Sequence, residues 1–316
     1  MVDAIKQELI LRKSELRDSV ATIYFGGGTP SLLTVEEIKD ILTVIETHYK
    51  VGTGAEITLE ANPDDLSIGK IKALSHTKIN RLSIGIQSFF DEDLEYMNRA
   101  HTAKDALDSL KYAKEFFENI TVDLIYGIPG MTIDRWKQNL EQIFYLKIPH
   151  LSSYALTVEE KTALASFIKK GKYPPVNESL ARAHFELLVK ECRKNKMIQY
   201  EISNFAWPGY YSKHNSAYWK REHYLGIGPS AHSFVGNSRS WNIDNNNLYV
   251  KAIAKNELPS EQELLTNKDV FNEMIMTGLR TIWGIDLEEI SATFSPKISE
   301  NLFSKSPGLV PSGGGG

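Results

Sequence analysis

The chain has 316 residues, of which 42% are hydrophobic and 24% are charged, and its formal net charge is −4 at pH 7. These values are typical of a globular protein with one large and one smaller domain, and the slightly acidic balance argues against nucleic acid as a partner. There is no apolar run of roughly 18 residues that could form a transmembrane segment, and a single cysteine, Cys192, allows no internal disulfide, so we expect a cytoplasmic location.

The first half of the chain alternates short apolar runs with longer amphipathic stretches. The apolar runs are rich in Ile, Leu, Val and Tyr and predict strands at 21–25, 56–61, 81–86, 120–125 and 150–155. Helical stretches lie between them, at 35–49, 68–75, 103–117 and 133–145. This regular alternation of strand and helix predicts a parallel sheet.

The first predicted strand runs directly into three glycines, Gly26 to Gly28, which are followed by Thr29 and Pro30. Glycine has no Cβ, so a backbone of this composition can bring its N–H groups close to a small polar ligand. A tight turn from strand to helix is the simpler alternative.

The predicted strands have one apolar and one polar face, although parallel strands are usually apolar on both. In the strand at 56–61, Ile57 and Leu59 alternate with Thr58 and Glu60. This pattern favours a β/α barrel whose inner face surrounds a polar ligand, with site residues at the carboxyl ends of the strands. Polar residues at these ends are Glu60, Gln87 and Asp123. A closed eight-stranded barrel is the alternative, but only about five strand signals precede a change of pattern.

The second half of the chain has a different organisation. A helix is predicted at 178–194, a strand-like segment at 199–205, and a polar, aromatic and glycine-rich stretch at 207–247. Helices resume at 269–279 and 287–294, and the end of the chain has the composition of a flexible linker. We therefore expect a partial barrel over 1–205, a smaller α+β accessory module over 206–300 and a flexible tail over 301–316.

The glycine-rich stretch contains the motif His214-Asn-Ser-Ala-Tyr-Trp219. Imidazole is a natural axial ligand of haem iron, and aromatic neighbours offer flat apolar contact to a porphyrin. If the motif is helical, His214 and Tyr218 lie one turn apart on one face. In the alternative interpretation His214 bonds a carbonyl group, and Tyr218 and Trp219 belong to the core.

The segments GGGTP, NRAH and DLIYGIPG, in this order, resemble the radical S-adenosylmethionine (SAM) family, and within it the branch of oxygen-independent coproporphyrinogen III oxidases and HemW haem chaperones. The H-N-x-x-Y-W motif is similar to the signature of the haem chaperones. The resemblance covers nearly all of residues 5–300 and implies an incomplete parallel (β/α)6-type barrel that lacks its first strand.

The resemblance also implies ligands and the residues that bind them. The family's glycine motif binds the amino acid part of SAM, which corresponds here to Gly27, Gly28 and Thr29. By motif and spacing, further contacts of this ligand are expected from Glu60, Gln87, Arg99 and Asp123. Glu60 suits the ammonium group and Arg99 the carboxylate, while Gln87 and Asp123 suit the ribose hydroxyls or a second substrate. His214 is the expected ligand of haem iron.

Structural roles are the alternative for two of these residues. Glu60 could form an ion pair with Arg81 or Arg99 inside the barrel, and Asp123 could cap Thr121 or a loop amide.

The function implied by the resemblance is haem binding and delivery of haem to acceptor proteins. Oxidative decarboxylation of coproporphyrinogen III by a 5′-deoxyadenosyl radical is the alternative. The family holds its [4Fe–4S] cluster with a C-x3-C-x2-C loop before the glycines, whereas this chain begins about twenty residues before them and contains only Cys192. A truncated chain with neither activity is therefore a third hypothesis, and we expect no cluster on the chain as written.

Overall fold

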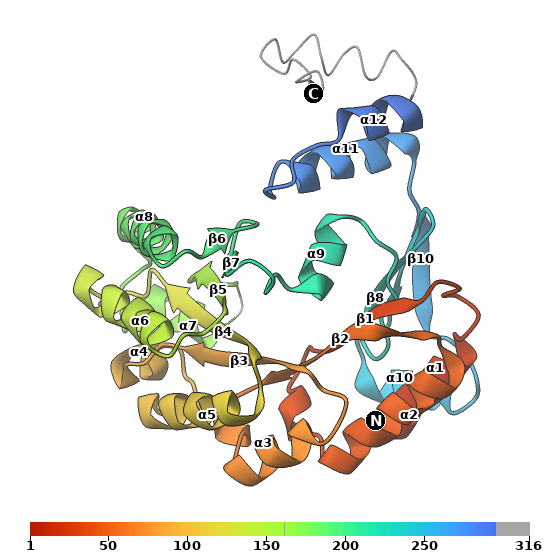
Figure 1. Cartoon of the computed structure of the whole chain (residues 1–316), viewed down its shortest axis with the longest axis horizontal. Coiled ribbons are helices and arrows are strands. Elements are labelled where there is room, and N and C mark those ends of the chain that lie inside the picture. Colours follow the sequence, from red (N-terminus) through yellow and green to blue (C-terminus); the bar gives the residue numbers. More distant parts are fainter. Residues whose placement is uncertain (161, 295–316) are drawn as a thin grey trace. The chain divides into compact units, whose positions relative to one another are not determined.

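The computed structural model describes residues 1–160 and 162–294, and Figure 1 shows the chain coloured along its sequence. The chain divides into two compact units. The first unit spans Asp18–Ser216, and the second combines Asp3–Arg17 with the chain from Ala217 onward. The sequence suggested a boundary at 205 and placed the N-terminal residues with the barrel. The structure instead extends the first unit to Ser216 and assigns the N-terminal helix to the second. The expected tail at 301–316 lies outside the described residues.

A seven-stranded sheet in the order β1-β2-β3-β4-β5-β7-β6 forms the centre of the first unit. The strands are β1 (Val20–Phe25), β2 (Val51–Ala61), β3 (Arg81–Gln87), β4 (Asn119–Tyr126), β5 (His150–Ala155), β6 (Ile198–Gln199) and β7 (Asn204–Ala206). β1 to β5 are parallel to their neighbours, while β7 is antiparallel to both β5 and β6. Among the described strands, β1 and β6 each pair with one neighbour, so the sheet is open, as expected for an incomplete barrel and unlike a closed eight-stranded one.

Helices follow the parallel strands along the chain and cover one face of the sheet (Figure 1). They are α2 (Val35–His48), α3 (Ile68–Ser75), α4 (Asp91–Tyr96), α5 (Ala103–Phe116), α6 (Ile133–Tyr145) and α8 (Glu178–Lys194), with short 3-10 turns at Pro30–Leu32 and Pro63–Asp65. α7 (Ala163–Lys169) lies between β5 and α8 along the chain. Thr34 and Glu37 form a capping box at the start of α2. Fully buried apolar side chains of strands and helices, such as Leu59, Leu82 and Trp136, form the core between them. Each such side chain contributes roughly 1.5–3 kcal/mol.

Two expected strands differ from the observed ones. β2 starts at Val51 rather than at 56, and a register irregularity between Val20 and Thr22 accompanies its pairing with β1. Gly52 and Gly54 interrupt the apolar pattern in this segment and hide the strand in the sequence. The segment at 199–205 is a hairpin rather than one strand, because the Glu201 side chain accepts a hydrogen bond from the Ser203 amide at 3.1 Å and stabilises a turn.

The second unit contains helices and a three-stranded antiparallel sheet in the order β10-β9-β8. Its elements are α1 (Val2–Leu11), β8 (His232–Val235), β9 (Ser238–Asn242), α10 (Asn246–Ile253), β10 (Ser260–Leu264), α11 (Asn267–Gly278) and α12 (Leu287–Thr293). This composition confirms the expected α+β character of the smaller module. None of the helices in the described ranges is long and apolar enough to cross a membrane.

A buried carboxylate attaches α1 to the rest of the second unit. Glu8 is fully buried and accepts hydrogen bonds from Tyr249 Oη at 2.5 Å, Asn242 Nδ2 at 2.7 Å and the Gly228 amide at 2.8 Å. Arg12, one turn later, lies 3.2 Å from the same carboxylate. The N-terminal helix therefore depends on residues more than two hundred positions away in the sequence.

Candidate functional site

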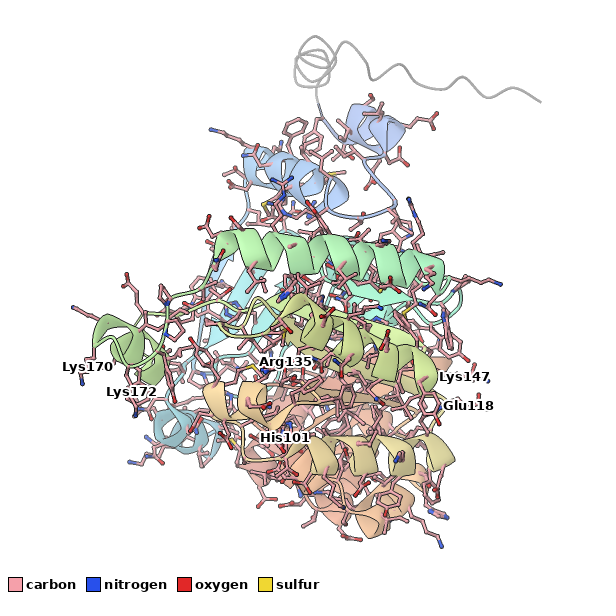
Figure 2. All side chains as sticks on the ribbon, turned by 90° about the vertical axis from the view of Figure 1, so that its left-hand side faces the viewer. His101, Glu118, Arg135, Lys147, Lys170 and Lys172 are labelled. Carbon is pink, nitrogen blue, oxygen red and sulfur yellow. The ribbon has the colours of Figure 1, made fainter. Side chains whose placement is uncertain are left out.

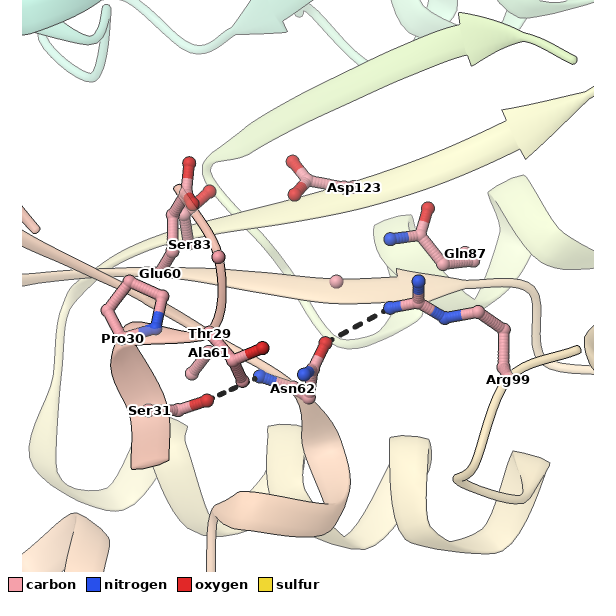
Figure 3. A pocket seen from close by; sticks show the side chains of 12 residues that line it. Thr29, Pro30, Ser31, Glu60, Ala61, Asn62, Ser83, Gln87, Arg99 and Asp123 are labelled. Atoms are coloured by element: carbon pink, nitrogen blue, oxygen red, sulfur yellow. Dashed lines mark hydrogen bonds between the residues drawn. The ribbon is translucent and has the colours of Figure 1, made fainter. Parts of the chain in front are cut away.

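A polar pocket lies at the carboxyl ends of the first four strands, on the face of the sheet that carries the polar side chains (Figure 3). Residues singled out from the sequence that line it are Gly28, Thr29, Glu60, Gln87, Arg99 and Asp123. Gly27 adjoins this set, because its amide donates a hydrogen bond to Glu60 Oε2 at 3.1 Å. His214 is not among the lining residues. The structure thus brings the expected SAM contacts together, and the expected haem ligand does not line this pocket.

Glu60 is held by hydrogen bonds rather than by an ion pair. Its Oε1 accepts a hydrogen bond from Tyr24 Oη at 2.6 Å. Burial and the neighbouring Glu60 raise the pKa of the Tyr24 hydroxyl, so Tyr24 remains a donor. Arg81, one of the alternative partners, faces Glu56 instead, with its Nε 3.8 Å from Glu56 Oε2.

The sequence analysis missed Tyr24, although its position two residues from Thr22 places it on the polar face of β1. Gly26 makes room for its contact with Glu60. A Cβ at position 26 would lie 2.5 Å from the Tyr24 ring and 3.2 Å from Glu60 Cδ. A glycine is therefore required here by close approach.

Gln87 and Arg99 lie side by side at the end of β3. Gln87 has a φ of +65°, a left-handed conformation that costs a non-glycine residue energy and that recurs at active sites and ligand clamps. A Cβ at position 85 would lie 2.8 Å from Gln87 Nε2 and 3.5 Å from an Arg99 guanidinium nitrogen, so Gly85 provides the space that both side chains occupy. Arg99 is oriented by Asn62, whose Oδ1 accepts its hydrogen bond at 3.0 Å (Figure 3).

Asp123, on β4, carries the most unusual carboxyl group of the pocket. Burial, and then the charge of Glu60, raise its pKa to about 7, while a hydrogen bond from Ser152 acts in the opposite direction. The carboxyl group can therefore donate or accept a hydrogen bond near neutral pH. Thr121, its possible partner in the alternative interpretation, bonds Arg81 and His150 instead.

Together these groups suit a ligand with both charges of an amino acid. Glu60 can accept from an ammonium group, Arg99 can donate to a carboxylate, and Gln87 and Asp123 can bond hydroxyl groups. The backbone of Gly27 and Gly28, with φ of 73° and 60°, adopts a conformation that other residues rarely take.

His214 lies near the start of α9 (Lys213–Trp219), so the helical interpretation of its motif is confirmed. Its Nδ1 is 2.8 Å from Thr22 Oγ1, and its ring stacks on that of Tyr24 with 4.6 Å between the centroids. Burial, followed by the charge of Arg81, lowers the pKa of the imidazole to about 4, so the ring is neutral at physiological pH. The bond at Nδ1 goes to a hydroxyl group, not to the carbonyl of the alternative interpretation.

The aromatic residues of the same motif differ in their environment. Tyr218 is 44% exposed and contacts Tyr224 edge to face, which does not fit the alternative of a core residue. Trp219 is partly buried, and no residue within the described ranges bonds its indole Nε1.

Three other histidines have structural partners. His101, labelled in Figure 2 near the helical face of the first unit, is buried, with its Nε2 3.0 Å from the Ile86 carbonyl. His150 is buried between Thr121 and Tyr200, and His184 is buried beside the Gly127 amide. They are weaker candidates for haem than the partly exposed His214.

The described residues do not fit a [4Fe–4S] cluster. Cys192 is 1% exposed within α8, and burial raises the pKa of its thiol. No group of three or more His, Cys, Asp or Glu side chains suited to a metal ion occurs in the part of the chain that the structure describes. One cysteine in 316 residues cannot supply the thiolates that such a cluster requires.

Comparisons with known proteins agree with this fold. A profile of the Radical SAM superfamily matches residues 2–143. The heme chaperone HemW of Bacillus subtilis is 36% identical over 98% of this chain and 81% of its own length. The heme chaperone HemW of Lactococcus lactis is 36% identical over 93% of this chain and 78% of its own length. The solved structure of coproporphyrinogen III oxidase (HemN) from Escherichia coli has a TM-score of 0.80 and covers 96% of this chain and 72% of its own, at 22% identity. This last likeness concerns the fold alone.

Proposed function

Because the chain belongs to the HemW family within the radical SAM superfamily, we propose that it binds haem through His214 and delivers it to acceptor proteins. The observation that carries this proposal is the state of His214: a neutral, partly exposed imidazole whose orientation is fixed by Thr22 and Tyr24. Imidazole in this state can donate a lone pair to haem iron. The cytoplasmic location and the transfer to acceptor proteins belong to the same proposal.

We further propose that the polar pocket binds SAM, with its ammonium group at Glu60 and its carboxylate at Arg99. In the superfamily this ligand supplies a radical when it is bound to a reduced cluster. The residues of this chain offer no cluster ligands, so we assign to them only the binding and orientation of SAM. We do not propose oxidation of coproporphyrinogen, because that reaction would need the cluster. The likeness to HemN, at 22% identity, extends only to the fold.

The haem proposal is tested by titrating the purified chain with ferric haem and recording the Soret band. We expect His214→Ala to abolish or shift the band and to weaken binding at least tenfold, because the iron loses its axial ligand. His76→Ala is the matched control, since His76 is exposed and its Nδ1 lies 2.6 Å from the Lys72 carbonyl. An unaltered spectrum and affinity for His214→Ala would show that this residue is not the ligand.

A further inference from the structure

The polar pocket at the ends of the strands contains two opposite charges that are not paired with each other. Glu60 and Arg99 both line it, and Figure 3 shows Glu60 on its left and Arg99 on its right. Each is held by neutral groups, and neither forms an ion pair within the described ranges. A carboxylate and a guanidinium group in one pocket attract each other. What keeps them apart therefore decides whether both charges remain available to a ligand.

The Glu60 carboxylate is oriented by one donor on each of its oxygens. Tyr24 Oη donates to Oε1 at 2.6 Å, and the Gly27 amide donates to Oε2 at 3.1 Å. An ionised carboxylate oxygen has two lone pairs, so each oxygen retains capacity for a further donor. The carboxylate is thus fixed in direction and still able to accept from an ammonium group.

The side chain of Tyr24, which makes the shorter of these two contacts, is itself firmly placed. Its ring stacks on that of His214, with 4.6 Å between the centroids and an interplanar angle of 12°. Gly26 leaves space for the ring, because a Cβ there would lie 2.5 Å from it. Burial raises the pKa of the hydroxyl group, so it stays protonated and donates. A side chain locked in this way can hold its neighbour in one orientation.

Arg99 is held from a different part of the chain. Asn62 Oδ1 accepts a hydrogen bond from its guanidinium group at 3.0 Å. The Asn62 amide donates to Ser31 Oγ at 3.2 Å, and the buried Ser31 hydroxyl donates to Asp65 Oδ2 at 2.6 Å. The two charges of the pocket therefore have separate supports, and a change at Tyr24 acts on Glu60 alone.

We propose that Tyr24 is a positioning residue for the ammonium group of the ligand: its hydroxyl group holds the Glu60 carboxylate in the orientation that accepts this group and keeps it from turning toward Arg99. The inference rests on the proposed binding of SAM in this pocket. In this role the hydroxyl group acts through Glu60, so its effect is confined to the amino acid part of the ligand.

The test measures, by isothermal titration calorimetry, the affinities of two ligands that differ in this part. SAM carries the ammonium and carboxylate groups, whereas 5′-methylthioadenosine lacks both. Losing a hydrogen bond to a charged group corresponds to roughly a 10- to 100-fold change in affinity, so we expect Tyr24→Phe to weaken SAM binding at least tenfold. The affinity for 5′-methylthioadenosine should stay within about twofold of the wild type, whereas a purely structural effect would weaken both ligands.

A double-variant cycle and a matched control complete the experiment. If Tyr24 acts through Glu60, the double variant Tyr24→Phe/Glu60→Gln should bind SAM no more weakly than Glu60→Gln alone. Tyr96→Phe makes the same chemical change outside the pocket, where the Tyr96 hydroxyl donates to the Pro174 carbonyl at 3.2 Å, and it should leave both affinities unchanged. Thermal melting followed by circular dichroism establishes that each variant is folded.

The outcomes separate this inference from the proposed binding of SAM. If Glu60→Gln weakens SAM binding while Tyr24→Phe keeps the wild-type affinity, the role of Tyr24 is wrong and SAM binding stands. Equal losses for both ligands in Tyr24→Phe, or additive losses in the double variant, would also overturn it, because the hydroxyl group would not act through Glu60. If the wild-type chain does not bind SAM, or if Glu60→Gln binds it unchanged, the proposed binding of SAM fails, and the role of Tyr24 fails with it.

Discussion

At the scale of single residues, the raised pKa of Asp123 has a consequence for stability. The folded chain holds the Asp123 proton up to about pH 7, whereas the unfolded chain releases it near the ordinary value of 3.8. Between these values the folded state binds more protons, so the free energy of unfolding falls as the pH rises through this window. Above pH 7 the folded protein must accommodate a partly buried carboxylate beside Glu60.

Replacing Asp123 by Asn removes the free-energy cost of holding a carboxylate beside Glu60 above pH 7. We expect Asp123→Asn to stabilise the protein at pH 8, by up to about 4 kcal/mol because the pKa of Asp123 is raised from 3.8 to about 7 in the folded chain, and to have little effect at pH 4. Urea denaturation at the two pH values measures the difference. Asp134→Asn, at an exposed position in the first turn of α6, is the control and should show no such pH dependence. Equal effects of Asp123→Asn at both pH values would contradict the raised pKa of Asp123 in the folded chain.

Some of the candidate site was predictable at this scale, and some was not. Glu60 and Asp123 were found because period-two alternation separates the polar from the apolar face of a strand. Tyr24 was missed because an aromatic residue in an apolar strand gives no signal of its own. Its role depends on the hydrogen bond to Glu60 and on the space that Gly26 leaves beside its ring. Both follow from the folded structure, and no spacing in the sequence indicates them. The contact of Thr22 with His214 joins residues 192 positions apart, and no local pattern indicates it.

At the scale of elements, β1 is an edge of the sheet and pairs only with β2 among the described strands. An edge strand exposes unpaired backbone groups that can bind another chain, and natural proteins often protect such edges with lysine. Apart from Ala21, which is exposed, its residues are partly buried. The sequence of the strand, VATIYF, contains no charged side chain that would discourage pairing with a second copy.

We expect Ala21→Lys to reduce self-association without lowering the melting temperature by more than about 2 °C, because a surface substitution usually changes stability by less than 0.5 kcal/mol. Light scattering against protein concentration measures the effect. Ala254→Lys, at the end of α10 and away from any strand, controls for the added charge. If both variants associate as the wild type does, copies of the chain do not associate through the edge of β1.

The boundaries of most elements followed from local signals, such as the Thr34 capping box at the start of α2. Predictions were wrong where a local signal was weak or misleading. Glycines concealed the first part of β2, and the strand-like pattern of 199–205 concealed the turn stabilised by Glu201. In both places tertiary pairing rather than intrinsic propensity determines the structure.

At the scale of the whole molecule, the assignment of α1 to the second unit could not be predicted, because it depends on Glu8 contacting residues far along the chain.

We expect Glu8→Ala to destabilise the second unit by about 3–5 kcal/mol, since it removes a buried carboxylate that Arg12, Asn242 and Tyr249 all contact. Hydrogen exchange measures this locally: amides of β9 should exchange faster, while those of β2 to β4, in the first unit, should keep their protection. Asp3→Ala is the control, because that side chain is 97% exposed on the same helix. Equal loss of protection in both units would mean that they unfold as one cooperative body, and unchanged protection in β9 would mean that Glu8 does not hold α1 in place.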